Sequence, residues 1–206
     1  MERLSKEGVG GGSMGGVGGG TYFYDWSQYS TNLFKAAFNG QAVGRHVGDE
    51  IWRGLEGAGD GGEEIKNIHI IGISVGAFAA DAAVTRLRKY LDQRSPSSSS
   101  PPVRLQLTLL DPFTQRGVLG VNWGTRNFGK NADYAQQFLN TDDPVPSTNE
   151  PCDNCAVWDV TGTERRKGEE GDVFGHDWPL VHYTKYENVG MVEEGDRKGR
   201  GTVTFK

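Results

Sequence analysis

One short pattern constrains the fold of this chain more than any other. The stretch Ile65 to Ile71 is rich in isoleucine, as expected for a strand buried in a sheet. The stretch Val75 to Leu91 is rich in alanine and is typical of a helix. Between them lies the pattern Gly-x-Ser-x-Gly, from Gly72 to Gly76. In this context it predicts a sharp strand-to-helix turn with Ser74 at its apex.

The residues around Ser74 fit the steric and electrostatic demands of such a turn. A sharp turn leaves little room for bulky side chains two residues away on each side, and Gly72 and Gly76 meet that demand. Ala77 allows the helix to approach the sheet closely. The turn places the hydroxyl of Ser74 at a helix N-terminus, where the backbone N–H of Val75 is a candidate donor to an oxyanion.

Other segments alternate between strand and helix patterns. Val43, Val47, Ile51 and Leu55 recur every four residues and predict a helix that a glycine cluster at 57–62 ends. Further elements are expected as strands at Thr21–Tyr24, Val103–Leu110, Tyr134–Leu139 and Ala156–Val160, and as a short helix from Trp178. Apolar strands that alternate with helices predict an α/β fold with a mostly parallel sheet and helices on both faces.

Length and composition limit the organisation and the partners. The chain has 206 residues, which suits a flexible glycine-rich lead at 1–20 and one domain at 21–206. A Ser/Pro linker is expected at 95–102. The net charge of −5, with both signs mixed along the chain, argues against nucleic acid as a partner. We find neither an apolar run near the ~20 residues of a membrane span nor a secretory signal, so a cytoplasmic location is the default expectation.

The two cysteines do not predict a cofactor. Cys152 and Cys155 form a C-x-x-C pair without a second pair or histidines at ligand spacing, which argues against zinc. They precede a strand, whereas a redox dithiol normally opens a helix after one. We expect a loop role, with a local disulfide left open, and we predict no metal and no other cofactor.

Two acids and one histidine are candidate partners of Ser74. Asp111 follows a predicted strand and precedes Pro112. Asp143, next to Asp142, follows the strand predicted at Tyr134–Leu139. A serine nucleophile in this setting needs an acid and then a histidine further along the chain. For each acid the simpler interpretation is an aspartate that starts a turn before proline.

The four histidines differ in their setting. His46 precedes the serine on a predicted helix, and His69 lies within a predicted buried strand, where a packed neutral histidine is expected. His176 follows a glycine and precedes the late helix, whereas His182 falls within that helix. Because catalytic groups are common on loops, we favour His176 over His182.

Three segments together resemble a known family. They are Asp25-Trp26-Ser27, then Asn67-Ile68-His69-Ile70-Ile71-Gly72-Ile73-Ser74-Val75-Gly76-Ala77, then Leu110-Asp111-Pro112. In order and spacing they resemble the pancreatic-type (lipase/vitellogenin) branch of the α/β-hydrolases over residues 21 to 113. In that branch a strand ending in Asp-Trp leads through a long helix to the serine turn and then to Leu-Asp-Pro. The resemblance implies hydrolysis of triacylglycerols, phospholipids or other esters by a triad of Ser74, Asp111 and His176.

The chain departs from this family at several points. Ile73 replaces the family's usual histidine before the serine, at a position without a chemical role. The stretch Asp143-Pro144-Val145-Pro146 resembles the acid loop of fungal class 3 lipases, so Asp143 stays an alternative acid, ranked behind Asp111 because the pancreatic-type match is longer. The His-Gly loop that supplies a second oxyanion donor does not precede Thr21, and two to three early strands are missing. The expectation is an N-terminally incomplete version of the fold, unless the glycine-rich lead supplies that donor.

The sequence therefore predicts a serine carboxylic-ester hydrolase of the esterase or lipase type. It would act on a small-molecule ester or a lipid through an acyl-enzyme. The lid and the C-terminal lipid-binding domain of large lipases are not recognisable, which favours a soluble esterase over an interfacial lipase. One alternative is a non-catalytic protein of the same fold that binds a lipid or another small molecule. A peptidase or a thioesterase would use the same triad.

Overall fold

The computed structural model describes most of the central part of the chain. The described residues are 33–57, 65–94, 102–117, 120–145, 148–163, 166, 175–186 and 202–204. The glycine-rich lead at 1–20, the strand expected at 21–24 with its Asp-Trp, and the linker at 95–101 lie outside them.

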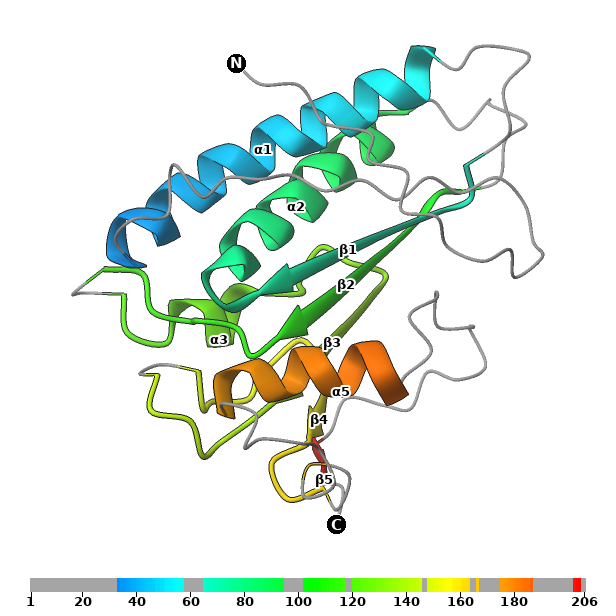
Figure 1. The fold of residues 1–206 in the computed structure, drawn as a ribbon. Helices are drawn as coiled ribbons and strands as arrows, with labels where there is room; N and C mark the ends of the chain where they lie inside the picture. Colours follow the sequence, from blue (N-terminus) through cyan, green and yellow to red (C-terminus); the bar gives the residue numbers. More distant parts are fainter. Residues whose placement is uncertain are drawn as a thin grey trace.

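Five strands form one sheet in which every neighbouring pair is parallel (Figure 1). They follow the chain in the order β1 (Asn67–Ile73), β2 (Arg104–Leu110), β3 (Tyr134–Leu139), β4 (Ala156–Asp159) and β5 (Thr202–Thr204). The sequence did not predict β5, which lies in a charged, glycine-rich tail. All five strands point the same way, so their carboxyl ends share one edge of the sheet.

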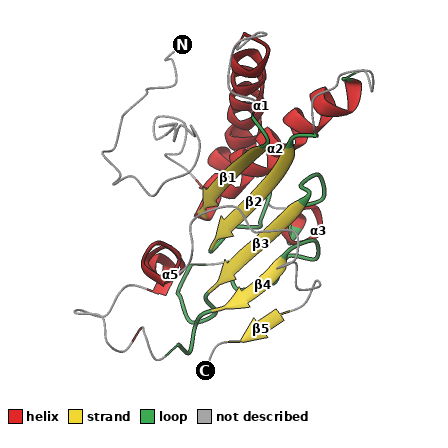
Figure 2. Ribbon diagram, turned by 90° about the vertical axis from the view of Figure 1, so that its right-hand side faces the viewer, coloured by secondary structure: helices red, strands yellow, loops and turns green. Residues whose placement is uncertain are grey.

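Helices cover both faces of this sheet. The elements are α1 (Leu33–Gly57), the 3₁₀ turn η3 (Ser74–Gly76), α2 (Ala77–Gln93), α3 (Trp123–Asn127), the 3₁₀ turn η4 (Gly175–Asp177) and α5 (Trp178–Tyr186). Figure 2 shows α1, α2 and α3 on one side of the sheet and α5 on the other. The predicted α/β fold with a parallel sheet and helices on both faces is confirmed. None of the described helices is both long enough and apolar enough to span a membrane.

The core has one apolar layer on each face of the sheet. Leu105, Leu107 and Leu109 alternate along β2 and belong to the layer under α2, where they cluster with Val84 and Leu87. The layer on the other face packs under α5 and consists of Leu110, Phe138, Val160, Trp178 and Tyr183. Because α5 follows η4 directly, this second layer also fixes the position of η4 at the carboxyl edge.

Two elements begin at different residues from those expected. The strand expected at Ile65–Ile71 lies two residues later, because its pairing with β2 starts at Asn67 and continues to Ile73. It therefore runs up to Ser74 without a gap. Helix α1 begins ten residues before Val43, the first residue of the four-residue pattern. This first part packs through small residues such as Ala36 and Ala37, which a pattern of large apolar side chains does not reveal.

Glycines let α1 approach α2 closely. A Cβ at Gly44 would lie 2.1 Å from the carbonyl oxygen of Ala79, and one at Gly48 would lie 2.8 Å from the Cβ of Arg86. Gly54 lies in the same helix, and a Cβ there would meet no described atom within 4 Å. The α1–α2 contact therefore depends on the first two glycines and not on the third.

This difference predicts opposite effects of the same substitution within one helix. Gly44→Ala should lower the free energy of unfolding by about 1–3 kcal/mol, because the added methyl forces the helices apart. Gly54→Ala should raise it by about 0.5–1 kcal/mol, because alanine is the better helix former and the site is open. Urea denaturation of both variants beside the wild type measures the two effects, and a stabilised Gly44→Ala would contradict the packing.

Candidate active site

Ser74 occupies a sharp turn between β1 and α2, as the sequence predicted. Its φ angle is 50°, in the left-handed region that residues other than glycine rarely adopt. Its side chain is half-buried, and the turn continues through η3 into α2. A serine held in a strained conformation at a strand end fits a functional position, because such strain persists only where the surroundings enforce it.

The two glycines of the pattern have different surroundings. A Cβ at Gly72 would lie 2.7 Å from the Cβ of Ala80 and 3.0 Å from the Cα of Ala77, so the close approach of α2 to β1 requires glycine there. A Cβ at Gly76 would meet no described atom within 4 Å. The expected steric demand is therefore confirmed at Gly72, whereas the described residues place no such demand on Gly76.

Asp111 lies beside Ser74 at the carboxyl edge of the sheet. Strands β1 and β2 are paired so that Ile73 is opposite Leu110, and Ser74 and Asp111 are the next residues on each strand. The backbone N–H of Phe113 donates to the carbonyl oxygen of Ser74 at 3.1 Å, which joins the two turns directly. Asp111 also has a positive φ, of 45°, and is fully buried.

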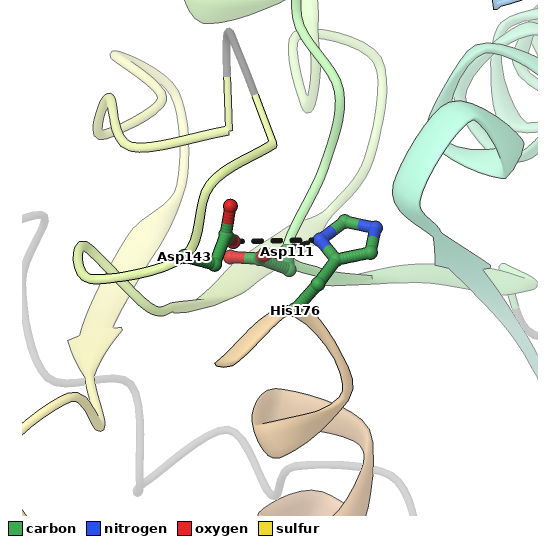
Figure 3. Close-up of side chains that lie close together, drawn as sticks. All are labelled: Asp111, Asp143 and His176. Carbon is green, nitrogen blue, oxygen red and sulfur yellow. Dashed lines mark hydrogen bonds and ion pairs between the residues drawn. The ribbon is translucent and has the colours of Figure 1, made fainter. Parts of the chain in front are cut away.

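His176 meets both candidate acids. Its Nδ1 lies 2.6 Å from Oδ2 of Asp111 and 3.4 Å from Oδ2 of Asp143. Figure 3 shows the three side chains close together. These three side chains come from the end of β2, the segment after β3 and the turn η4. In Figure 3 the second nitrogen of the imidazole points away from both carboxylates, to the side where β1 and α2 lie. Nδ1 is thus held by the two acids, and Nε2 lies on the side of β1 and α2.

The other histidines lie in different settings. His46 pairs with Glu50 within α1. His69 is half-buried rather than fully packed, and its Nε2 lies 2.8 Å from the hydroxyl of Thr108. His182 is buried in α5, as expected, and its ring packs against Trp178. His176 is accordingly the histidine that the fold brings to the two aspartates.

Asp111 and Asp143 differ in their hydrogen bonds. Oδ1 of Asp111 accepts the backbone N–H of Asn140 at 3.1 Å, which leaves Oδ2 to face His176. Oδ1 of Asp143 accepts the backbone N–H of Val145 at 2.6 Å, and the hydroxyl of Thr148 lies 3.2 Å from its Oδ2. Both carboxylates are thus held in place, but the nearer one to the imidazole is Asp111.

Burial and the neighbouring charges shift the pKa values of all three groups in the cluster. Burial, and then the neighbouring Asp143, raise the pKa of Asp111 to about 7 against the hydrogen bond from His176. The hydrogen bond to Asp111 and the charges of both acids raise the pKa of His176 above its ordinary value. Burial acts to raise the pKa of Asp143, but its hydrogen bonds and the charge of His176 lower it overall. Asp143 is therefore ionised at neutral pH.

These three residues are also the candidate metal ligands among the described residues. One ligand atom from each of Asp111, Asp143 and His176 lies within 4.8 Å of the others. Two ligands of a tetrahedral zinc ion at ~2.1 Å lie roughly 3.4 Å apart. Nδ1 and Oδ2 of Asp111 are closer, at 2.6 Å, which is a charge-assisted hydrogen bond. The cluster has the geometry of a hydrogen-bonded acid–histidine pair with a second acid beside it.

The two cysteines lie in a turn before β4, as expected, and both thiols are free and buried. The backbone N–H of Cys155 donates to the carbonyl oxygen of Cys152 at 3.1 Å, and the N–H of Cys152 donates to the side chain of Gln137. Their side chains belong to the core layer under α2. They do not contribute to the acid–histidine cluster.

One residue of this region is not identified by the sequence patterns. Asn140 is fully buried and contacts Asp111 through its backbone. Its position was visible, since it directly follows the strand predicted at Tyr134–Leu139. An asparagine that ends a buried strand at the carboxyl edge is a signal for such a role, but turn formation explains the same residue equally well.

No protein-family model, curated protein or solved structure matches this chain.

The raised pKa of His176 can be tested directly. Because the hydrogen bond to Asp111 is its main cause, Asp111→Asn should lower the pKa of His176 toward or below that of an ordinary histidine. Titration of the imidazole signals by NMR measures the change, and the spectrum of His176→Gln assigns the signal. An unchanged pKa of His176 would contradict the hydrogen bond.

Proposed function

We propose that this chain is a serine hydrolase of the α/β-hydrolase type that acts on carboxylic esters. Ser74 is the nucleophile, His176 the general base and Asp111 the acid that orients the imidazole. The observation that carries this proposal is the hydrogen bond between Asp111 and His176, made by an aspartate that follows the strand beside the one ending at Ser74. The chain order serine, aspartate, histidine agrees with this fold type, as does the resemblance to the pancreatic-type branch.

The hydrogen bond to Asp111 determines what His176 can do. Nδ1 carries the proton in this bond, so Nε2 is the acceptor of the neutral imidazole. Nε2 removes the proton from the hydroxyl of Ser74 as its oxygen attacks the ester carbonyl, and it then returns that proton to the departing alcohol. Water enters next, and its proton passes to Nε2 as its oxygen attacks the acyl carbon. Nε2 then returns that proton to the oxygen of Ser74 as the carboxylic acid is released. The carboxylates stabilise the imidazolium formed in both steps.

The start of the helix after Ser74 supplies oxyanion stabilisation in this proposal. The first N–H groups of a helix have no acceptor within it, and the N–H of Val75 is one of them. In related chemistry, the loss of one such donor costs about 10²–10³ in turnover. A second donor is expected from the part of the chain before Thr21, which lies outside the described residues.

Asp111 is proposed as the principal acid, and Asp143 as a second carboxylate that stabilises the charged imidazole. Asp111 makes the shorter contact, at 2.6 Å against 3.4 Å. The family resemblance placed Asp111 ahead of Asp143 only because the pancreatic-type match is longer. The distances of the two carboxylates from Nδ1 of His176 are an independent reason for the same order. The second acid adds negative charge beside His176 without replacing the first.

Removal of the nucleophile tests the proposal. Ser74→Ala should reduce the hydrolysis of p-nitrophenyl acetate and butyrate by about 10³-fold or more, because the covalent step is lost. Fluorophosphonate labelling of the wild type should modify Ser74 and should disappear in the variant. Thr184→Ala, which removes an exposed hydroxyl on α5, is the control and should keep full activity.

If the folded wild type hydrolyses these esters no faster than Ser74→Ala does, the catalytic proposal is wrong. The alternative from the sequence, a protein that binds a lipid or another small molecule without chemistry, would then be favoured. Parallel assays with a thioester and an anilide distinguish the remaining hydrolase classes, and a preference for the anilide would indicate a peptidase.

The two acids should differ in their effect on turnover. Asp111→Asn should lower kcat by about 10²–10⁴-fold, because the imidazole loses the partner that fixes its tautomer. Asp143→Asn should cost less, because its contact with Nδ1 is longer. Steady-state kinetics of both variants and of the double variant measure the order. A larger loss for Asp143→Asn than for Asp111→Asn would reverse the assignment of the principal acid.

A further inference from the structure

Asn140 contacts the candidate site from two directions. Its backbone N–H donates to Oδ1 of Asp111 at 3.1 Å. Its side-chain Nδ2 donates to Oδ1 of Asp142 at 2.8 Å, and its Oδ1 accepts from Nη1 of Arg166 at 3.2 Å. The residue is fully buried. A single residue thus links the orienting acid of the proposed triad, through its backbone, to an ion pair outside the triad, through its side chain.

That ion pair closes a small network, which we name the Asn140 cluster: Asn140, Asp142 and Arg166. Nη1 of Arg166 lies 2.7 Å from Oδ2 of Asp142 and 3.4 Å from the carbonyl oxygen of Thr161. The side chain of Asp142 is 49% exposed, whereas that of Arg166 is 16% exposed. The cluster therefore reaches from the surface to the buried carboxylate of Asp111.

The histidine turn lies directly on this cluster. A Cβ at Gly175 would be 3.0 Å from Nδ2 of Asn140, 3.0 Å from the Cβ of Asp143 and 3.1 Å from Oδ1 of Asp142. These distances leave little room for a side chain at position 175, so the backbone of η4 packs closely against the cluster there. Because His176 is the next residue, this packing determines the position of its Cα and therefore where its side chain can reach.

We propose that Asn140 is a positioning residue that holds the carboxylate of Asp111 and the turn of His176 in register with each other. Its side chain anchors the segment 140–143 through Asp142 and Arg166, and this anchor keeps its backbone N–H aimed at Asp111. Asn140 touches no reacting atom and acts through Asp111 and His176. Its effect on catalysis rests on the proposed function, whereas its effect on the imidazole does not.

The inference has a signature that a purely structural role lacks. If the side-chain anchor is removed, the backbone N–H at position 140 is no longer held toward Oδ1 of Asp111, and Oδ2 is then less firmly directed at Nδ1 of His176. The hydrogen bond that chiefly raises the pKa of His176 then weakens, so that pKa falls. The general base must be neutral, so the acid limb of the pH profile of kcat/KM moves to lower pH.

The other charged groups around η4 have to be kept constant for this test. Asp111 and Asp143 face the imidazole, Asp142 and Arg166 lie against Gly175, and Asp177 and His182 follow on η4 and α5. A double variant, Asn140→Asp with Asp142→Asn, exchanges the amide and the carboxylate. It keeps the net charge, the hydrogen bond between the two positions and an acceptor for Arg166.

The experiment compares Asn140→Ala, the double variant and Asn131→Ala in the full chain. Asn131 is the matched control, because its Nδ2 bonds the hydroxyl of Thr85 away from the site. NMR titration gives the pKa of His176 in each protein, and pH-dependent kinetics on p-nitrophenyl butyrate give kcat and kcat/KM. We expect Asn140→Ala to lower the pKa of His176, to shift the acid limb in the same direction and to reduce kcat by about 10–100-fold with little change in KM. The double variant should restore all three, and Asn131→Ala should change none.

An unchanged pKa of His176 in a folded Asn140→Ala would overturn the inference, even if the protein melted at lower temperature. If Asn140→Ala does not fold, Arg166→Gln removes the ion pair with Asp142 from the anchor and must lower the same pKa, or the inference fails. The NMR result stands without any esterase activity. Failure of the proposed function, shown by Ser74→Ala, is thereby distinguished from failure of the positioning role.

Discussion

The parallel pairing of β1 with β2 is the constraint on which the candidate site depends. It sets Ile73 opposite Leu110, so the chain leaves both strands at the same level of the sheet. Each strand then turns sharply through a residue with positive φ, Ser74 on one and Asp111 on the other. Neither turn is stable by itself, because left-handed conformations cost free energy for residues with a Cβ. The hydrogen bond from the N–H of Phe113 to the carbonyl oxygen of Ser74 ties the two turns together, so each supports the other.

Burial of Asp111 creates an electrostatic problem that the neighbouring groups resolve. A carboxylate removed from water is disfavoured in its charged form, and its pKa rises to about 7. Two groups offset that cost, the N–H of Asn140 on one oxygen and the imidazole of His176 on the other. Asp143 lies close enough to favour the imidazolium but has its own hydrogen-bond donors, so it keeps its charge at lower pH. The arrangement separates the task of orienting the imidazole from the task of stabilising its charge.

The sequence predicted the parts of this site that depend on local patterns. The Gly-x-Ser-x-Gly turn, the α/β fold and its parallel sheet follow from the order and apolarity of neighbouring segments, and the structure confirms them. Asp111, Asp143 and His176 were candidates because each follows a strand or precedes a helix, and the structure brings all three together. Their order of distance from Nδ1 was beyond the sequence, since it depends on contacts between segments 29 to 65 residues apart. The Asn140 cluster was not predicted for the same reason. The expected helix was shorter than α1, because alanine and glycine make the first contacts of α1 and the sequence pattern relied on large apolar side chains.

The position of His176 depends on contacts outside its own short turn, η4. A 3₁₀ turn of three residues provides few internal hydrogen bonds, so η4 cannot fix the side chain of His176 by local structure alone. Its position is set from two sides: Trp178 and Tyr183 of α5 anchor the following helix in the core, and Gly175 packs on the segment after β3. The second contact involves the same segment that supplies the backbone donor to Asp111. Asp111 and His176 thus share a contact with the segment after β3, and this shared contact helps to place the two side chains within 2.6 Å of each other.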